Sequence, residues 1–427
     1  MRYPLLLILG FFLAFSNPQT KTAEGILFSI PQIDSLKRIE GDTLFLETWE
    51  LWFSQPVDHN NNNGPRFPQR VIYNHKGFDK PMVVAIEGYN IFSIRAEEPT
   101  KLLDANQINI EHRFFERSRP KDSIPWKYLD IFQSATDIHM VIQAFKSHYP
   151  NKWVSTGISK GGQATIFHRY FYPSDVDVSI PYVAPLNFSN EDERVYSFLQ
   201  NVGTPECRER IERIQKELFK RKERLMPLAK DYTNNNNYTF EFGLNRAYNL
   251  NVLEYSFAFW QWSGLTCEEI PSPNVDDLEL FKHWVTVTSF DFFEDNSIDE
   301  VRPFFYQAMT EIGMYGYEVT PWQDFLPDTT NITFDFTIPK GHRAIFNPVP
   351  MQKVNEWIQT EGNYMLYIYG EYDPWSAPAV VPSPLTKSAI FFNPAGDHTT
   401  RIHSFPETTR DSIYTVLQNW LGITISK

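Results

Sequence analysis

Cysteine is scarce in this 427-residue sequence, which contains only Cys207 and Cys267. Two thiols this far apart in the chain do not make a zinc site, and the ten histidines include no His-Glu-x-x-His pattern. We therefore expect no metal and no other cofactor. Export would permit a disulfide between the two cysteines, worth about 3–4 kcal/mol of stability, with free thiols as the open alternative.

Basic residues are also in short supply. The chain has 39 Lys and Arg against 52 Asp and Glu, which gives a formal net charge of -13. A nucleic-acid-binding protein needs a clustered excess of Lys and Arg to neutralise phosphates. The composition therefore argues against nucleic acid as a partner.

Long apolar runs are missing beyond the N-terminus. The apolar run at residues 5–15 is shorter than the roughly 20 residues that a membrane-spanning helix needs. Arg2 precedes it, and Ala14 and Ser16 occupy the -3 and -1 positions of a plausible signal-peptidase site. We expect residues 1–16 to be a secretory signal peptide and the mature protein to be secreted or periplasmic, without membrane contact.

Apolar and aromatic residues are abundant, at 42% and 16%, and they can form a core larger than one compact domain usually holds. The first part of the chain alternates between short strand-like runs and amphipathic helical segments. The clearest of these are 42–53, 82–86, 135–149, 153–156, 163–172 and 176–183. This alternation predicts an α/β fold, with a mostly parallel sheet and helices on both faces.

The residue pattern of the chain changes after about residue 190, where charged and aromatic-rich helical segments replace the strand-like runs. Strand-like runs return at 364–369 and 388–392, and a final helix is expected over 406–420. We therefore predict a main domain built from 17–190 and 342–427, with a mainly helical cap inserted at 191–341.

A Gly-x-Ser-x-Gly pattern occupies residues 157–161, between a predicted strand and a predicted helix. That setting is typical of the nucleophile elbow of the α/β-hydrolase fold, with Ser159 as the nucleophile and the Lys160 amide as an oxyanion donor. An ordinary strand-to-helix turn is the alternative for the motif, and a merely solvated side chain is the alternative for Lys160. The loop after 82–86 should supply the second oxyanion donor, from the amide of Tyr89 or Gly88.

A serine nucleophile needs a base, and the base needs an acid to hold its tautomer. In this fold the acid and then the histidine follow the serine along the chain. Asp373 and His398 each lie in a loop directly after a predicted strand, and we expect them to fill these roles. The competing residues are Glu371 and Asp397 for the acid and His403 and His342 for the base.

With these residues in hand, the chain resembles the secreted bacterial prolyl tri- and tetrapeptidyl aminopeptidases, relatives of prolyl carboxypeptidase and dipeptidyl peptidase II. The matching stretches are 55–59, 111–115, 118–120, 133–146, 157–162 and 370–376. The resemblance implies an α/β-hydrolase fold with the triad Ser159, Asp373 and His398. It also implies peptide substrates, from which short N-terminal peptides are removed, often after proline.

Three further residues are candidates for substrate binding. Glu111 and Arg113 could contact the substrate, although a buried structural network is the alternative for such a cluster. Trp375 lies beside the expected acid and could line a proline-sized pocket, because a flat ring packs well against pyrrolidine; core packing is the alternative.

An aminopeptidase also needs carboxylates to bind the ammonium group of its substrate. Within the predicted cap, acidic residues that could do this are Asp291, Glu294 and Glu311. Two other functions stay open from the sequence. One is an esterase of the same fold, with an apolar gorge, and the other is a non-catalytic surface protein that binds glycans through its aromatic cap.

Overall fold

The computed structural model describes residues 21–61, 63–326 and 328–425. The expected signal peptide at 1–16 lies outside these residues. In the described part of the chain, no helix has both the length and the apolar character needed to cross a membrane.

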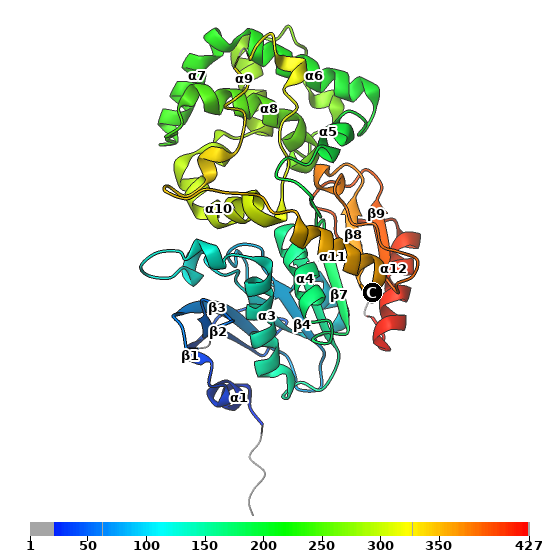
Figure 1. The fold of residues 1–427 in the computed structure, drawn as a ribbon. Coiled ribbons are helices and arrows are strands. Elements are labelled where there is room, and N and C mark those ends of the chain that lie inside the picture. Colours follow the sequence, from blue (N-terminus) through cyan, green and yellow to red (C-terminus); the bar gives the residue numbers. More distant parts are fainter. Residues whose placement is uncertain (1–20, 62, 327, 426–427) are drawn as a thin grey trace, which may run out of the picture.

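A single mixed sheet of nine strands organises the described chain (Figure 1). Its order is β1-β2-β3-β5-β4-β6-β7-β8-β9. The strands from β1 to β5 in this order pair antiparallel, and all pairs from β5 to β9 are parallel. The strand bounds are β1 Ile33–Ile39, β2 Glu47–Pro56, β3 Arg66–His75, β4 Met82–Ile86, β5 Asn106–Ile110, β6 Trp153–Ile158, β7 Val178–Tyr182, β8 Leu366–Gly370 and β9 Ala389–Asn393.

Helices cover both faces of this sheet. On one face Ile138 and Val141 of α3 pack against Val84 of β4, and on the other face Leu417 of α12 joins Val154 of β6 in a second core. The helices of this part of the chain are α1 Ala23–Ser29, α2 Glu98–Leu103, α3 Ile131–Lys146, α4 Lys160–Phe171, α11 Val349–Thr360 and α12 Glu407–Leu421. The α/β class predicted from the sequence is thereby confirmed.

The first strand differs from its prediction. The run expected as a strand over 42–53 is a turn up to residue 46 and then β2, and Leu46 is 71% exposed. The preceding edge strand β1 was not predicted, because most of its side chains face solvent or are half-buried, and so it lacks an alternating apolar pattern.

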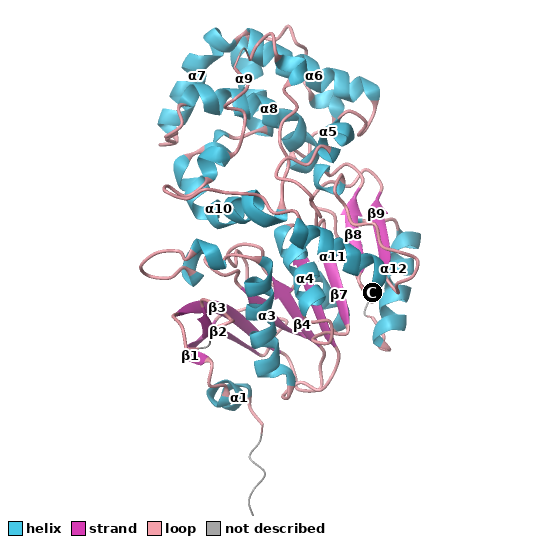
Figure 2. Ribbon diagram, viewed as in Figure 1, coloured by secondary structure: helices cyan, strands magenta, loops and turns pink. Residues whose placement is uncertain are grey.

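The chain leaves the sheet between β7 and β8 and forms a helical segment there, drawn in green and yellow in Figure 1 and containing only helices and loops in Figure 2. Its helices are α5 Arg194–Leu199, α6 Pro205–Lys220, α7 Lys222–Asn235, α8 Leu244–Trp262, α9 Asp277–Val287 and α10 Asp295–Gln307. We call residues 194–307 the helical segment. It lies in the part of the chain for which the sequence predicted a cap.

The central helix of this segment is α8, which is buried along most of its length. Tyr248 of α8 packs edge-on against Trp284 of α9, with ring centroids 4.8 Å apart. At its C-terminal end, the carbonyl of Gln261 accepts a hydrogen bond of 3.2 Å from the amide of His398. The helical segment therefore contacts the loop that follows β9.

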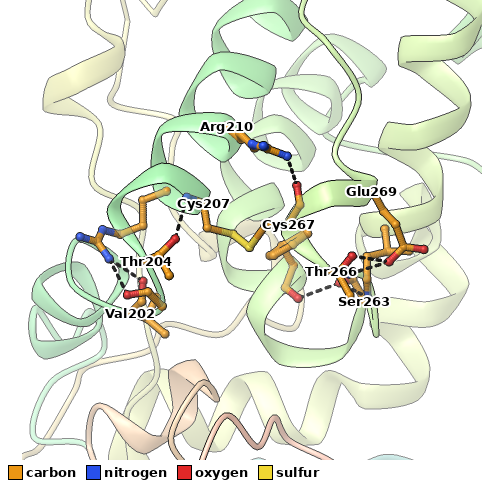
Figure 3. The surroundings of a disulfide bond; sticks show 12 residues. Val202, Thr204, Cys207, Arg210, Ser263, Thr266, Cys267 and Glu269 are labelled. Atoms are coloured by element: carbon orange, nitrogen blue, oxygen red, sulfur yellow. Dashed lines mark hydrogen bonds between the residues drawn. A yellow bond between two sulfur atoms is a disulfide. The ribbon is translucent and has the colours of Figure 1, made fainter.

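A disulfide joins Cys207 on α6 to Cys267, which follows α8 (Figure 3). The two cysteines are 60 residues apart in the chain, and their Cα atoms are 5.3 Å apart. Thr204 accepts a hydrogen bond from the Cys207 amide, and Arg210 donates one to the Cys267 carbonyl. The bridge thus fixes the start of α6 to the chain after α8.

Candidate active site

Ser159 occupies the sharp turn between β6 and α4. Its backbone has φ 56° and ψ -121°, a region that non-glycine residues rarely adopt. The strained turn is held by hydrogen bonds from the Ser159 amide to the Tyr182 carbonyl and from the Gln163 amide to the Ser159 carbonyl, both 2.9 Å. The Ser159 side chain is half-buried, as a nucleophile that must meet a substrate would be.

The glycines of the motif allow this turn to pack closely against β4. A Cβ atom on Gly157 would lie 2.7 Å from the Ile86 carbonyl oxygen, and one on Gly161 would lie 2.5 Å from the same atom. Both distances are shorter than real Cβ contacts. Glycine is therefore required on both sides of Ser159 by backbone packing, as the motif predicts.

Asp373 and His398 form a buried pair. The carboxylate Oδ2 of Asp373 lies 2.7 Å from Nδ1 of His398. The other oxygen, Oδ1, accepts a 3.1 Å hydrogen bond from the Trp375 amide. Within the described residues, Nε2 of His398 is buried and has no hydrogen-bond partner. This pairing leaves Nε2 as the ring nitrogen available for proton transfer.

Parallel pairing brings the three loops to the same edge of the sheet. Ile158 of β6 pairs with Tyr182 of β7, which pairs with Ile368 of β8, and Gly370 of β8 pairs with Asn393 of β9. The carboxyl ends of these strands are the position at which open α/β sheets bind ligands. Among the described residues, no hydrogen bond joins the Ser159 side chain to His398.

The competing residues have other partners. Asp397 accepts hydrogen bonds from the amide and hydroxyl of Thr399, and Glu371 accepts one from the Ala395 amide. His403 is largely exposed and pairs with a glutamate of α2. His342 packs edge-on against a tryptophan ring at 6.1 Å. The geometry therefore favours Asp373 and His398 over these residues.

The loop after β4 lies against the N-terminus of α4. A Cβ atom on Gly88 would lie 2.6 Å from both the carbonyl carbon and the Cβ of Lys160. The carbonyl of Tyr89 accepts a 3.0 Å hydrogen bond from the His112 amide, and the Tyr89 ring packs edge-on against Phe115. The backbones of Gly88 and Lys160 are thus side by side, where two oxyanion donors would have to lie.

The side chain of Lys160 is buried, which excludes the alternative that it is solvated. Its ammonium nitrogen lies over the rings of Phe115 and Tyr89, 5.3 and 5.9 Å from their centroids. Burial holds the pKa of Lys160 well below its usual range. Burial and the nearby Lys160 also lower the pKa of His112. Sequence reasoning missed this burial because the two aromatic rings come from distant segments.

Arg113 lies in a fully buried network. Its Nε and Nη2 donate to the two carboxylate oxygens of Asp137, at 2.6 and 2.7 Å. Its Nη1 donates to the carbonyls of Val57 and Tyr128, and its Nη2 also reaches the Pro56 carbonyl. All parts of the guanidinium are engaged within the protein. Arg113 therefore has the structural environment that we considered as the alternative to substrate binding.

Glu111 is buried in a neighbouring network. Its Oε1 accepts hydrogen bonds from the amide and hydroxyl of Ser118, and its Oε2 accepts one from the Ile91 amide. Arg70 lies 3.5 Å from the same carboxylate. Burial raises the pKa of Glu111, while these hydrogen bonds lower it. These contacts tie Glu111 to the chain around Ile91 and Ser118, and substrate contact by Glu111 stays a prediction.

Trp375 lies directly beside the candidate acid and is 9% exposed. Its ring packs edge-on against Phe257 of α8 and against Tyr315, with centroids 5.4 and 5.3 Å apart. The residue therefore connects the Asp373 loop with the aromatic core of the helical segment. Its predicted contact with a substrate proline stays a prediction.

The three acidic residues proposed for the ammonium group have separate locations. Asp291 is exposed, and Glu294 caps α10 by accepting a hydrogen bond from the Ser297 amide. Glu311 lies in the π-helical turn Ala308–Ile312 and accepts a 2.9 Å hydrogen bond from the Ile131 amide at the start of α3. Burial raises the pKa of Glu311 to about 8. The structure does not bring these three carboxylates together.

A different carboxylate, that of Glu254 on α8, was missed from the sequence. It is buried beside Tyr315 and Tyr317 and receives hydrogen bonds from both hydroxyls. The signal that could have found it is a single glutamate in an aromatic helical stretch, with no basic residue three or four positions away on either side.

No metal site is evident within residues 21–61, 63–326 and 328–425, where no group of three or more His, Cys, Asp or Glu side chains is placed to hold an ion. The expected absence of a cofactor stays a prediction.

The chain is similar to known proteins in sequence and in fold. The chain matches the family described as PS-10 peptidase S37 over residues 16–427. It is 31% identical over 384 residues to a prolyl tri/tetrapeptidyl aminopeptidase of Streptomyces mobaraensis, covering 87% of this chain and 80% of that protein. It is also 26% identical over 155 residues to a probable serine protease of Arabidopsis thaliana, which is 30% of this chain and 31% of that protein. Among solved structures, a proline iminopeptidase of Mycobacterium smegmatis is similar with a TM-score of 0.43 and 13% identity, covering 87% of this chain and 99% of that one.

Proposed function

The chain belongs to the peptidase S37 family and is a serine peptidase of the prolyl tri/tetrapeptidyl aminopeptidase type, and from this we propose that Ser159, His398 and Asp373 form its catalytic triad. The observation that carries the proposal is the buried Asp373–His398 pair at the sheet edge where the strained Ser159 turn lies. The same three residues were expected from the sequence pattern alone.

In the proposed mechanism, Nε2 of His398 takes the proton from the Ser159 hydroxyl while Oγ attacks the scissile carbonyl carbon. Asp373 holds the His398 tautomer through Nδ1 and stabilises the imidazolium that forms. Because the apo geometry of such sites is often loose, the Ser159 to His398 hydrogen bond is expected to form when substrate binds.

The negative charge that develops on the carbonyl oxygen would be stabilised by the amide of Lys160 and by the amide of Gly88 or Tyr89. His398 then gives its proton to the leaving amine, which departs and leaves an acyl group on Ser159. A water molecule gives a proton to His398 and attacks the carbonyl carbon of this ester. The bond to Ser159 Oγ breaks, the N-terminal peptide leaves with a free carboxylate, and His398 returns the proton to Oγ, which restores the Ser159 hydroxyl.

We further propose that the released product is a tri- or tetrapeptide cut from a free N-terminus, with proline preferred before the cut. The contact of α8 with the His398 and Trp375 loops supports this, because the helical segment lies over the site and can limit how much chain enters. Trp375 offers a flat ring against which a pyrrolidine can pack.

The test is a matched set of peptides with proline at the third position, each made with a free and with an acetylated N-terminus. Mass spectrometry should detect N-terminal tri- or tetrapeptides from the free form only. Internal cuts, or equal cleavage of both forms, would contradict the exopeptidase proposal. Hydrolysis of esters without hydrolysis of peptides would favour the esterase alternative.

The proposed location is outside the cytoplasm, in the medium or the periplasm. It is supported by the apolar N-terminal run with its small residues at 14 and 16. N-terminal sequencing of the exported protein should start near Asn17. An N-terminus still beginning at Met1 in the mature enzyme would contradict it.

A further inference from the structure

The buried carboxylate of Glu254 lies near the middle of α8 and is 6% exposed. The hydroxyl of Tyr315 donates to both of its oxygens, at 3.0 and 3.1 Å, and the hydroxyl of Tyr317 donates to Oε2 at 2.5 Å. Within the described part of the chain, no basic side chain forms an ion pair with Glu254. A buried carboxylate held by two neutral donors is therefore left without a cation.

Such a group costs free energy, since a charge taken out of water is offset only when it is paired. Burial accordingly raises the pKa of Glu254 to about 7, against the opposing hydrogen bonds from Tyr317 and Tyr315. A carboxylate has about four lone-pair positions, and two phenols do not use all of them. The cluster can accept one further donor, and a cation would suit it best.

The cluster lies next to the proposed catalytic loops. The ring of Tyr315 packs against that of Trp375 at 5.3 Å, and the Trp375 amide donates to Asp373. On the same helix as Glu254, the ring of Trp262 packs edge-on against that of His398, with centroids 5.0 Å apart. The helix that carries Glu254 thus lies close to both the Asp373 loop and the His398 loop.

Open space adjoins the cluster. Tyr317 lines a cavity of about 510 Å³, together with Leu253, Ser256 and Phe257 of α8 and Trp260 one turn further along. This size is within the range of small-ligand sites. The walls of the cavity come from α5, α6 and α8 of the helical segment and from residues 316–322.

We propose that Glu254, oriented by Tyr315 and Tyr317, binds the N-terminal ammonium group of the peptide substrate. The inference rests on the proposed exopeptidase function and names the residue that would recognise the free terminus. A carboxylate at a fixed position in α8 also sets the length of the released peptide, because each extended residue spans about 3.3–3.6 Å of the path from this carboxylate to Ser159. An acetylated terminus brings no charge and leaves the carboxylate unpaired.

The test compares wild type with Glu254→Gln on a proline-containing tripeptide chromogen with a free or acetylated N-terminus. Removing one partner of a buried pair should lower kcat/KM for the free substrate by about 10²–10³-fold. The variant should then cleave the free and acetylated forms at similar rates. Glu254→Asp should keep the preference for a free terminus, at reduced kcat/KM.

The matched control is Glu217→Gln, which alters another carboxylate of the helical segment, on α6, whose ion pairs are with Lys220 and Arg221 of the same stretch. It should keep the wild-type ratio between free and acetylated substrate. Labelling of Ser159 by a fluorophosphonate at the wild-type rate would show that each variant is folded. Should Glu254→Gln fail this check, Tyr317→Phe takes its place and should raise KM several-fold for the free substrate only.

The outcomes separate the inference from the function on which it rests. If wild type prefers the free terminus and Glu254→Gln, or its replacement Tyr317→Phe, keeps that preference unchanged, the assignment of Glu254 is overturned and the exopeptidase function stands. If wild type itself cleaves both forms equally, the exopeptidase function is overturned, and the inference falls with it.

Discussion

The buried Arg113 network allows a direct test of whether this residue supports the fold or binds substrate. Replacing Arg113 with Met keeps much of the side-chain volume but leaves Asp137 without its guanidinium and three carbonyls without their donor. Breaking a buried pair in this way costs about 3–5 kcal/mol. At roughly 2–4 °C per kcal/mol for a large domain, Tm should fall by roughly 6–20 °C.

Thermal denaturation gives the stability change, and kcat/KM at 25 °C is measured per active site titrated by a fluorophosphonate. We expect kcat/KM to stay within about twofold of wild type, because the guanidinium of Arg113 is engaged with Asp137 and three backbone carbonyls. Arg117→Met is the matched control, since Arg117 is half-exposed and its pair with Glu50 is worth at most about 1 kcal/mol. A stable Arg113→Met variant with a raised KM would refute the structural role and return Arg113 to substrate binding.

Three further predictions concern the oxyanion loop, the disulfide and the Glu254 carboxylate. Gly88→Ala should lower kcat about 10²-fold or more with little change in KM, because the new Cβ cannot fit against the start of α4 and the loop must shift; steady-state kinetics with unchanged kcat would contradict this. Cys207→Ser should destabilise the protein by about 4 kcal/mol in denaturant titrations, as expected for opening a loop closed over 60 residues, and an unchanged midpoint would argue against it. Burial raises the pKa of Glu254 from 4.5 to about 7, although the hydrogen bonds from Tyr317 and Tyr315 act in the opposite direction. The Glu254 carboxyl therefore binds its proton more tightly in the native state than in the unfolded chain. The free energy of unfolding of wild type should therefore fall by about 3 kcal/mol as pH rises from 4.5 through 7, and that of Glu254→Gln should not show this fall. Parallel curves of stability against pH for the two proteins would contradict the prediction.

The parts of the fold that could be predicted are those whose signal is local. The helix expected at 135–149 and observed as α3 has its apolar residues on one face, and the strands β6 and β7 are short buried runs between turns. The edge strand β1 could not be predicted, because its pairing with β2 uses backbone groups and its side chains remain largely outside the core. An alternating apolar pattern reflects the burial of side chains, and the side chains of an edge strand are little buried.

The residues of the candidate site also fall into two groups, those that a local sequence pattern predicts and those whose environment depends on distant segments. Ser159, Asp373 and His398 each stand at the end of a recognisable strand, so their element and order were readable from the sequence. The environments of Lys160 and Glu254 depend on rings that arrive from segments far away in the chain, such as Phe115 and Tyr315. Their burial and lack of counter-ions become visible only when those segments are packed together.

The most direct test of the central proposal is a fluorophosphonate competition experiment read by peptide mapping. The adduct should be found on Ser159, and a proline-containing peptide with a free N-terminus should slow its formation while the acetylated form should not. An adduct on another serine would contradict the proposed nucleophile. Equal protection by the two peptides would contradict recognition of the free terminus.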